Sequence, residues 1–148
     1  MLTLSQEQLE KYIFSCGLYK SKAAHILSAS RDIVDKFGGN VPEGFKELKS
    51  LAGVGQKTAN VVSSVWFDKD AIAVDTHVFR VSNRLGLAHA NNPLKTEEQL
   101  KEAIPQADWS KAHHWLIWHG RRVCHSQKPD CANCPLSECC DYFSEINK

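Results

Sequence analysis

The chain has 148 residues, which is enough for one ordinary domain or two small lobes with a buried core. Apolar residues make up 43% and charged residues 24%, as in a soluble globular protein, and the net charge of +1 neither indicates nor excludes a polyanionic partner. The N-terminal segment has no basic stretch followed by an apolar one, and no apolar run approaches membrane-spanning length. No signal peptide or membrane span is evident, so we expect a cytoplasmic protein with no membrane partner.

Apolar residues recur with helical period along nearly the whole chain, which predicts an all-α fold. The first predicted helix starts at a Ser5 cap and ends at Gly17, with Cys16 as a core thiol. The run "AIAV" at 71–74 is too short to found a sheet. A capping box formed by Thr96 and Gln99 predicts the start of the sixth helix. The other predicted helices cover 20–37, 44–50, 56–66, 76–85 with Asp75 as N-cap, the segment from Thr96 to near Pro105, and Ser110 to Arg122.

The predicted domain boundary lies in the loop 67–74, which divides the chain into domains 1–69 and 70–148. Beyond Cys124 the large apolar residues are too few to form a stable hydrophobic core by themselves. The binding free energy of a metal centre would stabilise this segment in place of such a core.

Five of the six cysteines fall within the last 25 residues, and the absence of a secretion signal argues against a disulfide framework. Structural zinc favours two close pairs, and only the Cys131–Cys134 pair has that spacing. The longer gaps favour a [4Fe–4S] cluster. Chemistry allows either Cys139 or Cys140 as the last ligand, and spacing does not decide between them. Counted through Cys140, the spacing of Cys124, Cys131, Cys134 and Cys140 is C-x6-C-x2-C-x5-C, and Cys139 is the alternative fourth ligand.

The stretch "LAGVGQKTANVV", residues 51–62, places two glycines directly before an apolar helix. Glycines permit left-handed backbone and close approach to a ligand, and the first turn of a helix presents unpaired amides to an anion. Such a hairpin holds a nucleic-acid backbone without reading its sequence. The candidate DNA-contacting residues of the hairpin are Leu51, Gly53, Val54 and Gly55, and Lys57 follows them in the helix.

Three motifs together make a resemblance specific. The stretch at 51–62, then "AVDTHVFRVSNRLGLA" at 73–88, then the cysteine spacing ending in "CDYF", is similar in order and spacing to the endonuclease III family of DNA glycosylases. The similarity covers essentially the whole chain. It implies a helix–hairpin–helix DNA glycosylase fold, with part of the helical barrel in 1–69 and an iron–sulfur cluster domain in 70–148.

The resemblance also implies roles for individual residues. Lys57 is expected to be the nucleophile, with Asp75 as its partner across a cleft. Leu18 matches a leucine that wedges into the duplex, and Lys128 matches a lysine that faces DNA. The [4Fe–4S] ligands would be Cys124, Cys131, Cys134 and Cys140, which removes the ambiguity over Cys139.

The implied function is base excision repair of double-stranded DNA that carries an oxidised or saturated pyrimidine or an abasic site. A lysine Schiff base and β-elimination would cut the strand. Only an uncharged amine is nucleophilic; desolvation and a helix N-terminus favour that form, whereas a carboxylate and DNA phosphates oppose it. We therefore expect Asp75 to accept a proton or stabilise positive charge on the sugar, besides capping its helix.

The chain departs from the family pattern in two places. Ala52 stands where a proline is usual, a mild loss of rigidity. Helices that precede this segment in the family have no counterpart, so we expect an N-terminally truncated chain with exposed apolar faces on the helices at 20–37 and 56–66. Such faces predict self-association or a complementing N-terminal segment.

Other functions remain open from the sequence. The main alternative is a non-cutting, DNA-binding iron–sulfur fragment. An adenine glycosylase acting opposite oxidised guanine would lack a lysine at position 57, and a small electron carrier would leave the hairpin without a role. The histidines near the C-terminus are expected to be packing or surface residues: His113, His114, His119 and His125.

Overall fold

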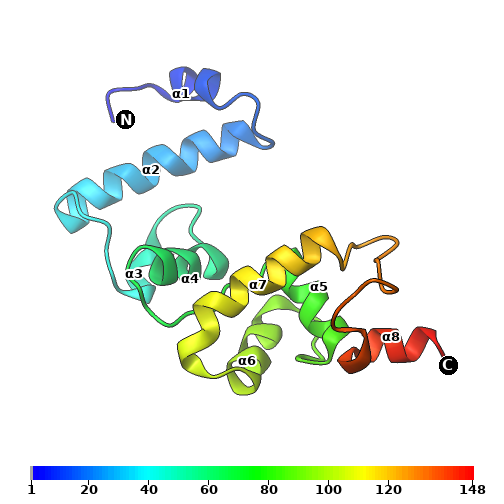
Figure 1. Cartoon of the computed structure of the whole chain (residues 1–148). Helices are drawn as coiled ribbons and strands as arrows, with labels where there is room; N and C mark the ends of the chain where they lie inside the picture. The colour runs from blue at the N-terminus through cyan, green and yellow to red at the C-terminus, as the bar shows by residue number, and fades with distance from the viewer. Residues whose placement is uncertain (1) are drawn as a thin grey trace. The chain divides into compact units, whose positions relative to one another are not determined.

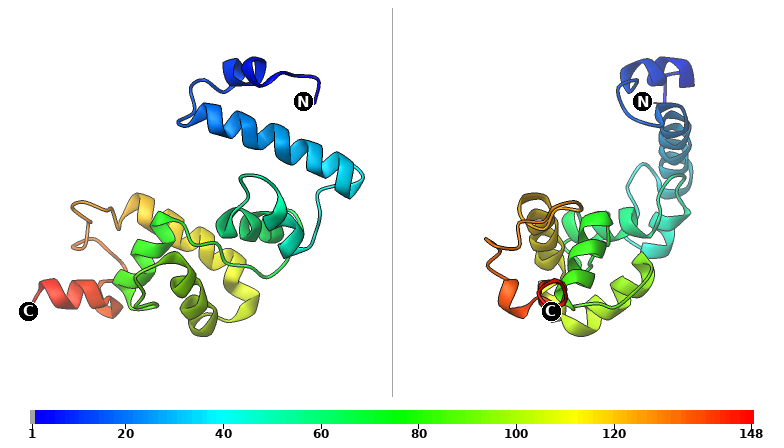
Figure 2. Two further views of the ribbon diagram at one scale, coloured as in Figure 1. Left: turned by 180° about the vertical axis from the view of Figure 1, so that it is seen from behind. Right: turned by 90° about the vertical axis from the view of Figure 1, so that its right-hand side faces the viewer.

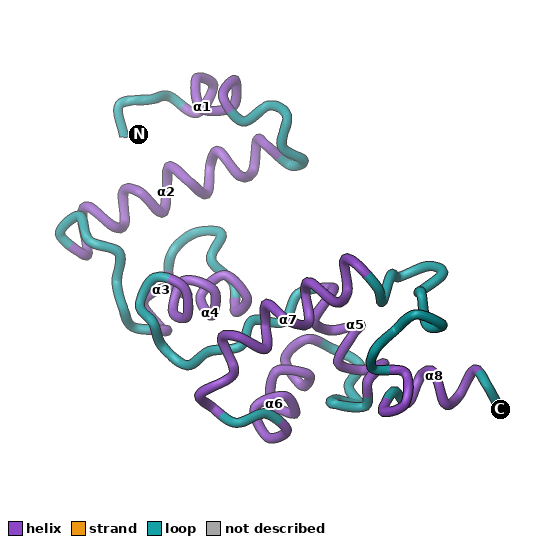
Figure 3. Tube along the Cα trace, in the orientation of Figure 1, coloured by secondary structure: helices purple, strands orange, loops and turns teal. Residues whose placement is uncertain are grey.

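The computed structural model describes residues 2–148, and within that range all regular secondary structure is helical (Figure 3). The predicted all-α class is confirmed, and residues 71–74 are extended without forming a strand. Short 3-10 turns at Gln106–Asp108 and Ser137–Cys139 precede the last two helices. The α-helices are α1 (Gln6–Tyr12), α2 (Tyr19–Phe37), α3 (Phe45–Ser50), α4 (Gln56–Val65), α5 (Thr76–Leu85), α6 (Pro93–Ala103), α7 (Trp109–Arg122) and α8 (Asp141–Ile146).

The chain forms two compact units, Met1–Ala59 and Asn60–Lys148, and α4 belongs partly to each. In the first unit α1 packs against α2, where Leu9, Ala23 and Leu27 form a small core (Figure 1). Helix α2 stops at Gly38, which takes a left-handed conformation and donates its amide to the Ile33 carbonyl. The predicted division between a barrel domain and a cluster domain at residue 69 stays a prediction.

The second unit is built around α5, which lies beside α7 in all three views of the ribbon (Figures 1 and 2). Its core joins the extended segment before α5 to the inner faces of α5, α6 and α7. Because this segment leads directly into α5, the same core fixes the backbone on either side of Asp75. The fully or nearly buried members are Ile72, Val74, Val78, Val81, Leu100, Ala112 and Leu116.

Three predicted helix boundaries were wrong. Helix α1 starts after the Ser5 cap as predicted but ends at Tyr12 rather than Gly17, so Tyr12 is 77% exposed and Cys16 is an exposed thiol rather than a core one. Helix α6 starts after Asn92, whose side chain caps it and is followed by Pro93 at the first helical position.

Thr96 is therefore an interior residue of α6, not its cap. It is fully buried, and its hydroxyl donates back to the Asn92 carbonyl at 3.0 Å. Helix α7 starts at Trp109, one residue before the predicted Ser110 cap.

Several large apolar side chains are exposed, among them Val34 on α2 and Val65 and Trp66 at the end of α4. Val34 and Val65 lie on the two helices for which the sequence predicted uncovered apolar faces, and Trp66 directly follows the second of them. Self-association and a complementing segment stay predictions. Among helices in residues 2–148, none has the length and apolar content needed to cross a membrane.

Candidate functional site

The glycine turn predicted from the sequence is present between α3 and α4. Gly53 has φ +76°, and a Cβ built there would lie 2.9 Å from the Cβ of His25 on α2, so both conformation and space demand glycine. The Val54 amide donates to the Leu51 carbonyl at 3.1 Å, which closes the turn. Gly53 and Gly55 are exposed and Val54 is half-buried, whereas the Leu51 side chain is buried.

Lys57 lies in the first turn of α4, immediately after this hairpin, and its side chain is exposed. The helix N-terminus contributes partial positive charge and unpaired amides to the surface around it. Hairpin and lysine together present a surface suited to an anionic backbone, with a primary amine at its edge.

Asp75 caps α5 as predicted. Its Oδ1 accepts hydrogen bonds from the amides of His77 and Val78, each at 2.8 Å. Within residues 2–148, its Oδ2 has no hydrogen-bond partner. One carboxylate oxygen is therefore committed to the helix, while the other remains available for chemistry. Lys57 and Asp75 belong to different compact units, and their pairing across a cleft stays a prediction.

Leu18 and Lys128, the two residues predicted to contact DNA outside the hairpin, share an unusual backbone. Both are non-glycine residues with positive φ, 58° for Leu18 and 49° for Lys128. Leu18 is 81% exposed where α2 begins, and Lys128 is exposed in the loop after Cys124. Left-handed backbone costs a β-carbon residue about 1–2 kcal/mol, and an exposed leucine gains nothing from burial in return. Such uncompensated strain is typical of functional positions.

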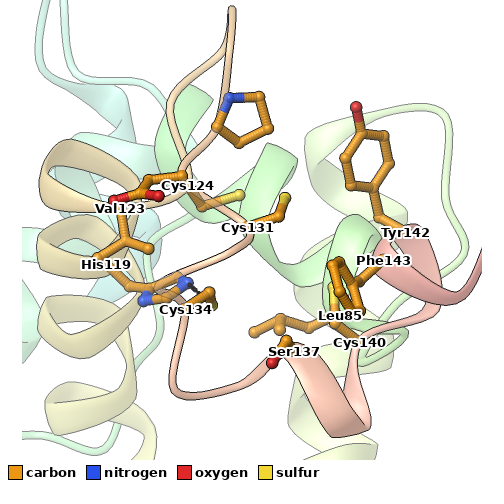
Figure 4. Close-up of a pocket in the computed structure, with 12 residues that line it drawn as sticks. Leu85, His119, Val123, Cys124, Cys131, Cys134, Ser137, Cys140, Tyr142 and Phe143 are labelled. Atoms are coloured by element: carbon orange, nitrogen blue, oxygen red, sulfur yellow. Dashed lines mark hydrogen bonds between the residues drawn. The ribbon is translucent and has the colours of Figure 1, made fainter. Parts of the chain in front are cut away.

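The four predicted cysteine ligands line one pocket in the second unit. In Figure 4, Cys124, Cys131 and Cys134 lie on one side of the pocket, and Cys140 lies on the other side beside Leu85 and Phe143. Cys139 does not line the pocket; its thiol is exposed and donates to the Leu136 carbonyl at 3.4 Å. Cys140 thus lines the pocket and Cys139 does not, and the role of Cys140 as the fourth ligand stays a prediction.

The arrangement of the sulfur atoms bears on what they can hold. Tetrahedral zinc, with Zn–S bonds of about 2.3 Å, needs sulfurs roughly 3.8 Å apart. In residues 2–148, no three His, Cys, Asp or Glu side chains are gathered closely enough to hold a metal ion. A four-iron cluster needs a wider arrangement, because each thiolate binds a different iron atom. Four thiols line one pocket, and their binding of a [4Fe–4S] cluster stays a prediction.

Electrostatics agree with a shared site. Burial raises the pKa of Cys131, and so do the nearby thiols of Cys124, Cys140 and Cys134, while Arg84 lowers it. The sulfurs are therefore close enough for four thiolates to repel one another. A bound cationic centre would relieve that repulsion.

Two arginines of α5 hold the loop that carries the first cysteine. Arg84 donates to the Cys124 sulfur at 3.4 Å and to the His125 carbonyl at 2.7 Å, and its guanidinium lies 4.6 Å from the centre of the Tyr142 ring. Arg80 donates to the Cys124 carbonyl at 2.9 Å. These arginines were not predicted; the available signal was two arginines four residues apart on the helix that follows Asp75.

The C-terminal histidines occupy different environments. His119 lines the cysteine pocket, where its Nε2 lies 3.7 Å from the Cys134 sulfur and burial lowers its pKa. His113 is buried in the core, whereas His114 and His125 are exposed. Packing and surface roles were expected for all four, and the position of His119 beside a candidate ligand was not foreseen.

Comparison with known proteins identifies the class to which this fold and site belong. Residues 1–106 match the HhH-GPD superfamily of base excision DNA repair proteins. The chain is similar to proteins named endonuclease III: it is 46% identical to that of Rickettsia felis over 97% of this chain and 68% of the relative. It is 49% identical to endonuclease III of Bacillus subtilis over 94% of this chain and 64% of the relative. It is 42% identical to endonuclease III of Escherichia coli K12 over 99% of this chain and 70% of the relative.

Solved structures give the same answer. The chain matches a trapped endonuclease III–DNA covalent intermediate, the estranged-adenine complex, with a TM-score of 0.94 and 44% identity over 99% of this chain and 70% of that one. A non-covalent endonuclease III–DNA complex matches with a TM-score of 0.93 at the same identity and coverage. The chain belongs to the endonuclease III family of base excision repair DNA glycosylases and AP lyases.

Proposed function

We propose that this chain binds double-stranded DNA containing an oxidised or saturated pyrimidine or an abasic site, removes the damaged base, and cuts the strand through a Schiff base on Lys57. The observation that carries the proposal is the position of Lys57, in the first turn of a helix that directly follows a left-handed glycine turn. The hairpin amides and the helix N-terminus bind the DNA backbone without reading its sequence.

The reaction begins with extrusion of the damaged nucleotide, at a cost of a few kcal/mol, and Leu18 fills part of the space it leaves. The Lys57 amine attacks the sugar C1′. The N–C1′ bond forms, the glycosidic bond breaks, and the base leaves with the bonding electron pair and takes up a proton. The amine then loses a proton as the C1′–O4′ bond breaks, which opens the sugar ring and leaves a C1′=N Schiff base and a hydroxyl at C4′. Loss of a proton from C2′ then breaks the C3′–O bond, the 3′ phosphate leaves with the bonding electron pair, and the strand is cut by β-elimination.

Protonation decides whether Lys57 can attack. Its side chain is exposed in the free protein, so the desolvation that favours an uncharged amine must come largely from bound DNA. The Oδ2 atom of Asp75, the oxygen that does not cap α5, accepts the amine proton or stabilises positive charge that develops on the sugar.

The second unit contributes the cluster site. Cys124, Cys131, Cys134 and Cys140 would hold a [4Fe–4S] cluster, whose positively charged core would offset the repulsion among the thiolates and order a segment with little apolar core of its own. The support is the shared pocket and the donor set of four thiols. Lys128 extends from the loop between the first two ligands towards a DNA phosphate.

Borohydride trapping on an abasic duplex tests the proposal. The full chain is expected to give a covalent protein–DNA adduct, and Lys57→Gln is expected to give none while keeping its helical content and melting temperature. Lys46→Gln, which removes the same charge from an exposed position on α3, is the matched control and should trap normally. Undiminished trapping by Lys57→Gln would refute the assignment of the nucleophile. No trapping by the wild-type chain would favour the non-cutting, DNA-binding alternative.

A further inference from the structure

The backbone carbonyls of the extended segment 71–74 need hydrogen-bond partners, and side chains provide two of them. It is almost completely buried, yet it pairs with no strand within residues 2–148. A buried carbonyl without a partner costs about 1–3 kcal/mol. Two consecutive carbonyls, those of Ile72 and Ala73, are satisfied by side chains instead of backbone.

The two donors come from different helices, and both are buried. The Asn60 Nδ2 of α4 donates to the Ile72 carbonyl at 3.0 Å, and Asn60 is 3% exposed. The His113 Nδ1 of α7 lies 2.7 Å from the Ala73 carbonyl, and His113 is 6% exposed. Because a carbonyl can only accept, Nδ1 of His113 carries the hydrogen.

Both bonds lie close in sequence to the two proposed catalytic residues. Asn60 follows Lys57 by three residues on the same helix, a rise of about 4.5 Å. Asp75 follows Ala73 by two residues, so its Cα lies within about 7 Å along the chain of the carbonyl that His113 holds. The Asn60 bond thus joins the helix that carries Lys57 to the segment that ends at Asp75.

We propose that Asn60 and His113 are positioning residues that hold the backbone of the segment before Asp75 and so place its carboxylate for the reaction. Asn60 holds the Ile72 carbonyl from α4, and His113 holds the Ala73 carbonyl from α7. A displacement of about 1 Å at a reacting group can cost about 10²-fold in rate, so loss of one anchor slows chemistry more than it weakens DNA binding. This inference rests on the proposed function of Lys57 and Asp75.

A purely structural role for these bonds would produce a different pattern. Thr96 provides the comparison, because it is a fully buried residue of the same unit whose hydroxyl also donates to a backbone carbonyl. Thr96→Val removes that bond on α6, outside the segment that leads to Asp75. If stability alone controls the rate, Asn60→Ala and Thr96→Val with equal losses of melting temperature should lose activity equally.

The experiment measures the single-turnover rate of borohydride trapping at saturating abasic duplex, together with the Kd for the same duplex and the melting temperature. Rates are measured about 20 °C below the melting temperature of the least stable variant. Asn60→Ala is expected to trap 10- to 100-fold more slowly than wild type, with a Kd unchanged within about twofold. Thr96→Val is expected to trap at the wild-type rate.

A second pair of variants keeps the test decisive if Asn60→Ala fails to fold. His113→Asn retains a donor nitrogen at the same number of bonds from the backbone and should trap within about threefold of wild type. His113→Leu fills similar space without the donor and should trap at least tenfold more slowly at unchanged Kd. Wild-type trapping rates in folded Asn60→Ala or folded His113→Leu would overturn the inference, as would equal losses in Asn60→Ala and Thr96→Val.

The outcome also separates this inference from the proposed function. If Lys57→Gln traps DNA as well as wild type, the proposed nucleophile is wrong. If Lys57→Gln is inactive but Asn60→Ala and His113→Leu trap normally, only the positioning role fails.

Discussion

The Asp75 carboxylate caps α5 through one oxygen: its Oδ1 lies 2.8 Å from the amide nitrogen of Val78 and accepts from His77 as well. Capping and catalysis therefore fall on different oxygens of one side chain. This division makes the two roles of Asp75 separable by mutation.

Asp75→Asn keeps a side chain that caps helices as well as aspartate does, so unfolding free energy should change by only a few tenths of a kcal/mol. The variant loses the ionised oxygen, and single-turnover cleavage should fall about 10²- to 10⁴-fold. Asp75→Ala should lose the same activity and a further ~1 kcal/mol of stability in urea unfolding. Wild-type cleavage by Asp75→Asn would mean that Asp75 serves only as a cap.

Leu18→Gly should relieve the backbone strain at position 18, where φ is 58°. The free energy of unfolding should therefore be unchanged or rise by up to about 1 kcal/mol. Removal of damaged bases from intact duplex should slow about tenfold or more, because nothing then replaces the extruded nucleotide. Val34→Ala, which shortens another exposed apolar side chain of α2, is the control. A marked loss of stability in Leu18→Gly, or unchanged base removal, would contradict a wedge role.

Adjacent cysteines offer a direct test of cluster ligation. Cys140→Ser should abolish stable incorporation of iron and sulfide, because its thiol lines the pocket, whereas Cys139→Ser should retain both at wild-type stoichiometry. Iron and sulfide analysis with visible absorbance gives the result. Removal of iron from the wild-type chain should lower its melting temperature, because binding free energy orders the C-terminal segment. Full incorporation in Cys140→Ser would exclude this ligand set.

Lys128→Gln should weaken DNA binding through one phosphate contact. The slope of log K against log salt is about −0.9 for each such contact, so its magnitude should fall by about 0.9. Lys95→Gln, at an exposed position on α6, should leave the slope unchanged. Equal slopes for wild type and Lys128→Gln would remove Lys128 from the DNA-contacting surface.

Local sequence signals predicted the helices whose ends are defined by short-range chemistry. Asp75 caps α5 through amides two and three residues away, and Gly38 ends α2 through its own left-handed backbone. The error at α6 has the same origin. Both Asn92–Pro93 and Thr96–Gln99 resemble helix starts. The helix begins at the earlier one, because Asn92 caps it and Pro93 favours the first helical position.

Contacts between distant segments could not be predicted in this way. The Asn60 amide reaches the Ile72 carbonyl, and the Arg84 guanidinium reaches Cys124 forty residues later. Neither pair leaves a periodic or spaced pattern, because both depend on how helices pack. Lys57 was predicted from its motif, whereas the residues that anchor the backbone near it emerge only from the structure.

The most direct test of the account locates the covalent bond. The chain is trapped with borohydride on an abasic duplex, digested with protease and nuclease, and analysed by peptide mass spectrometry. The account predicts that the deoxyribose remnant lies on the peptide containing Lys57 and on no other. A remnant on a different lysine or on the N-terminal amine, with unmodified Lys57, would contradict it.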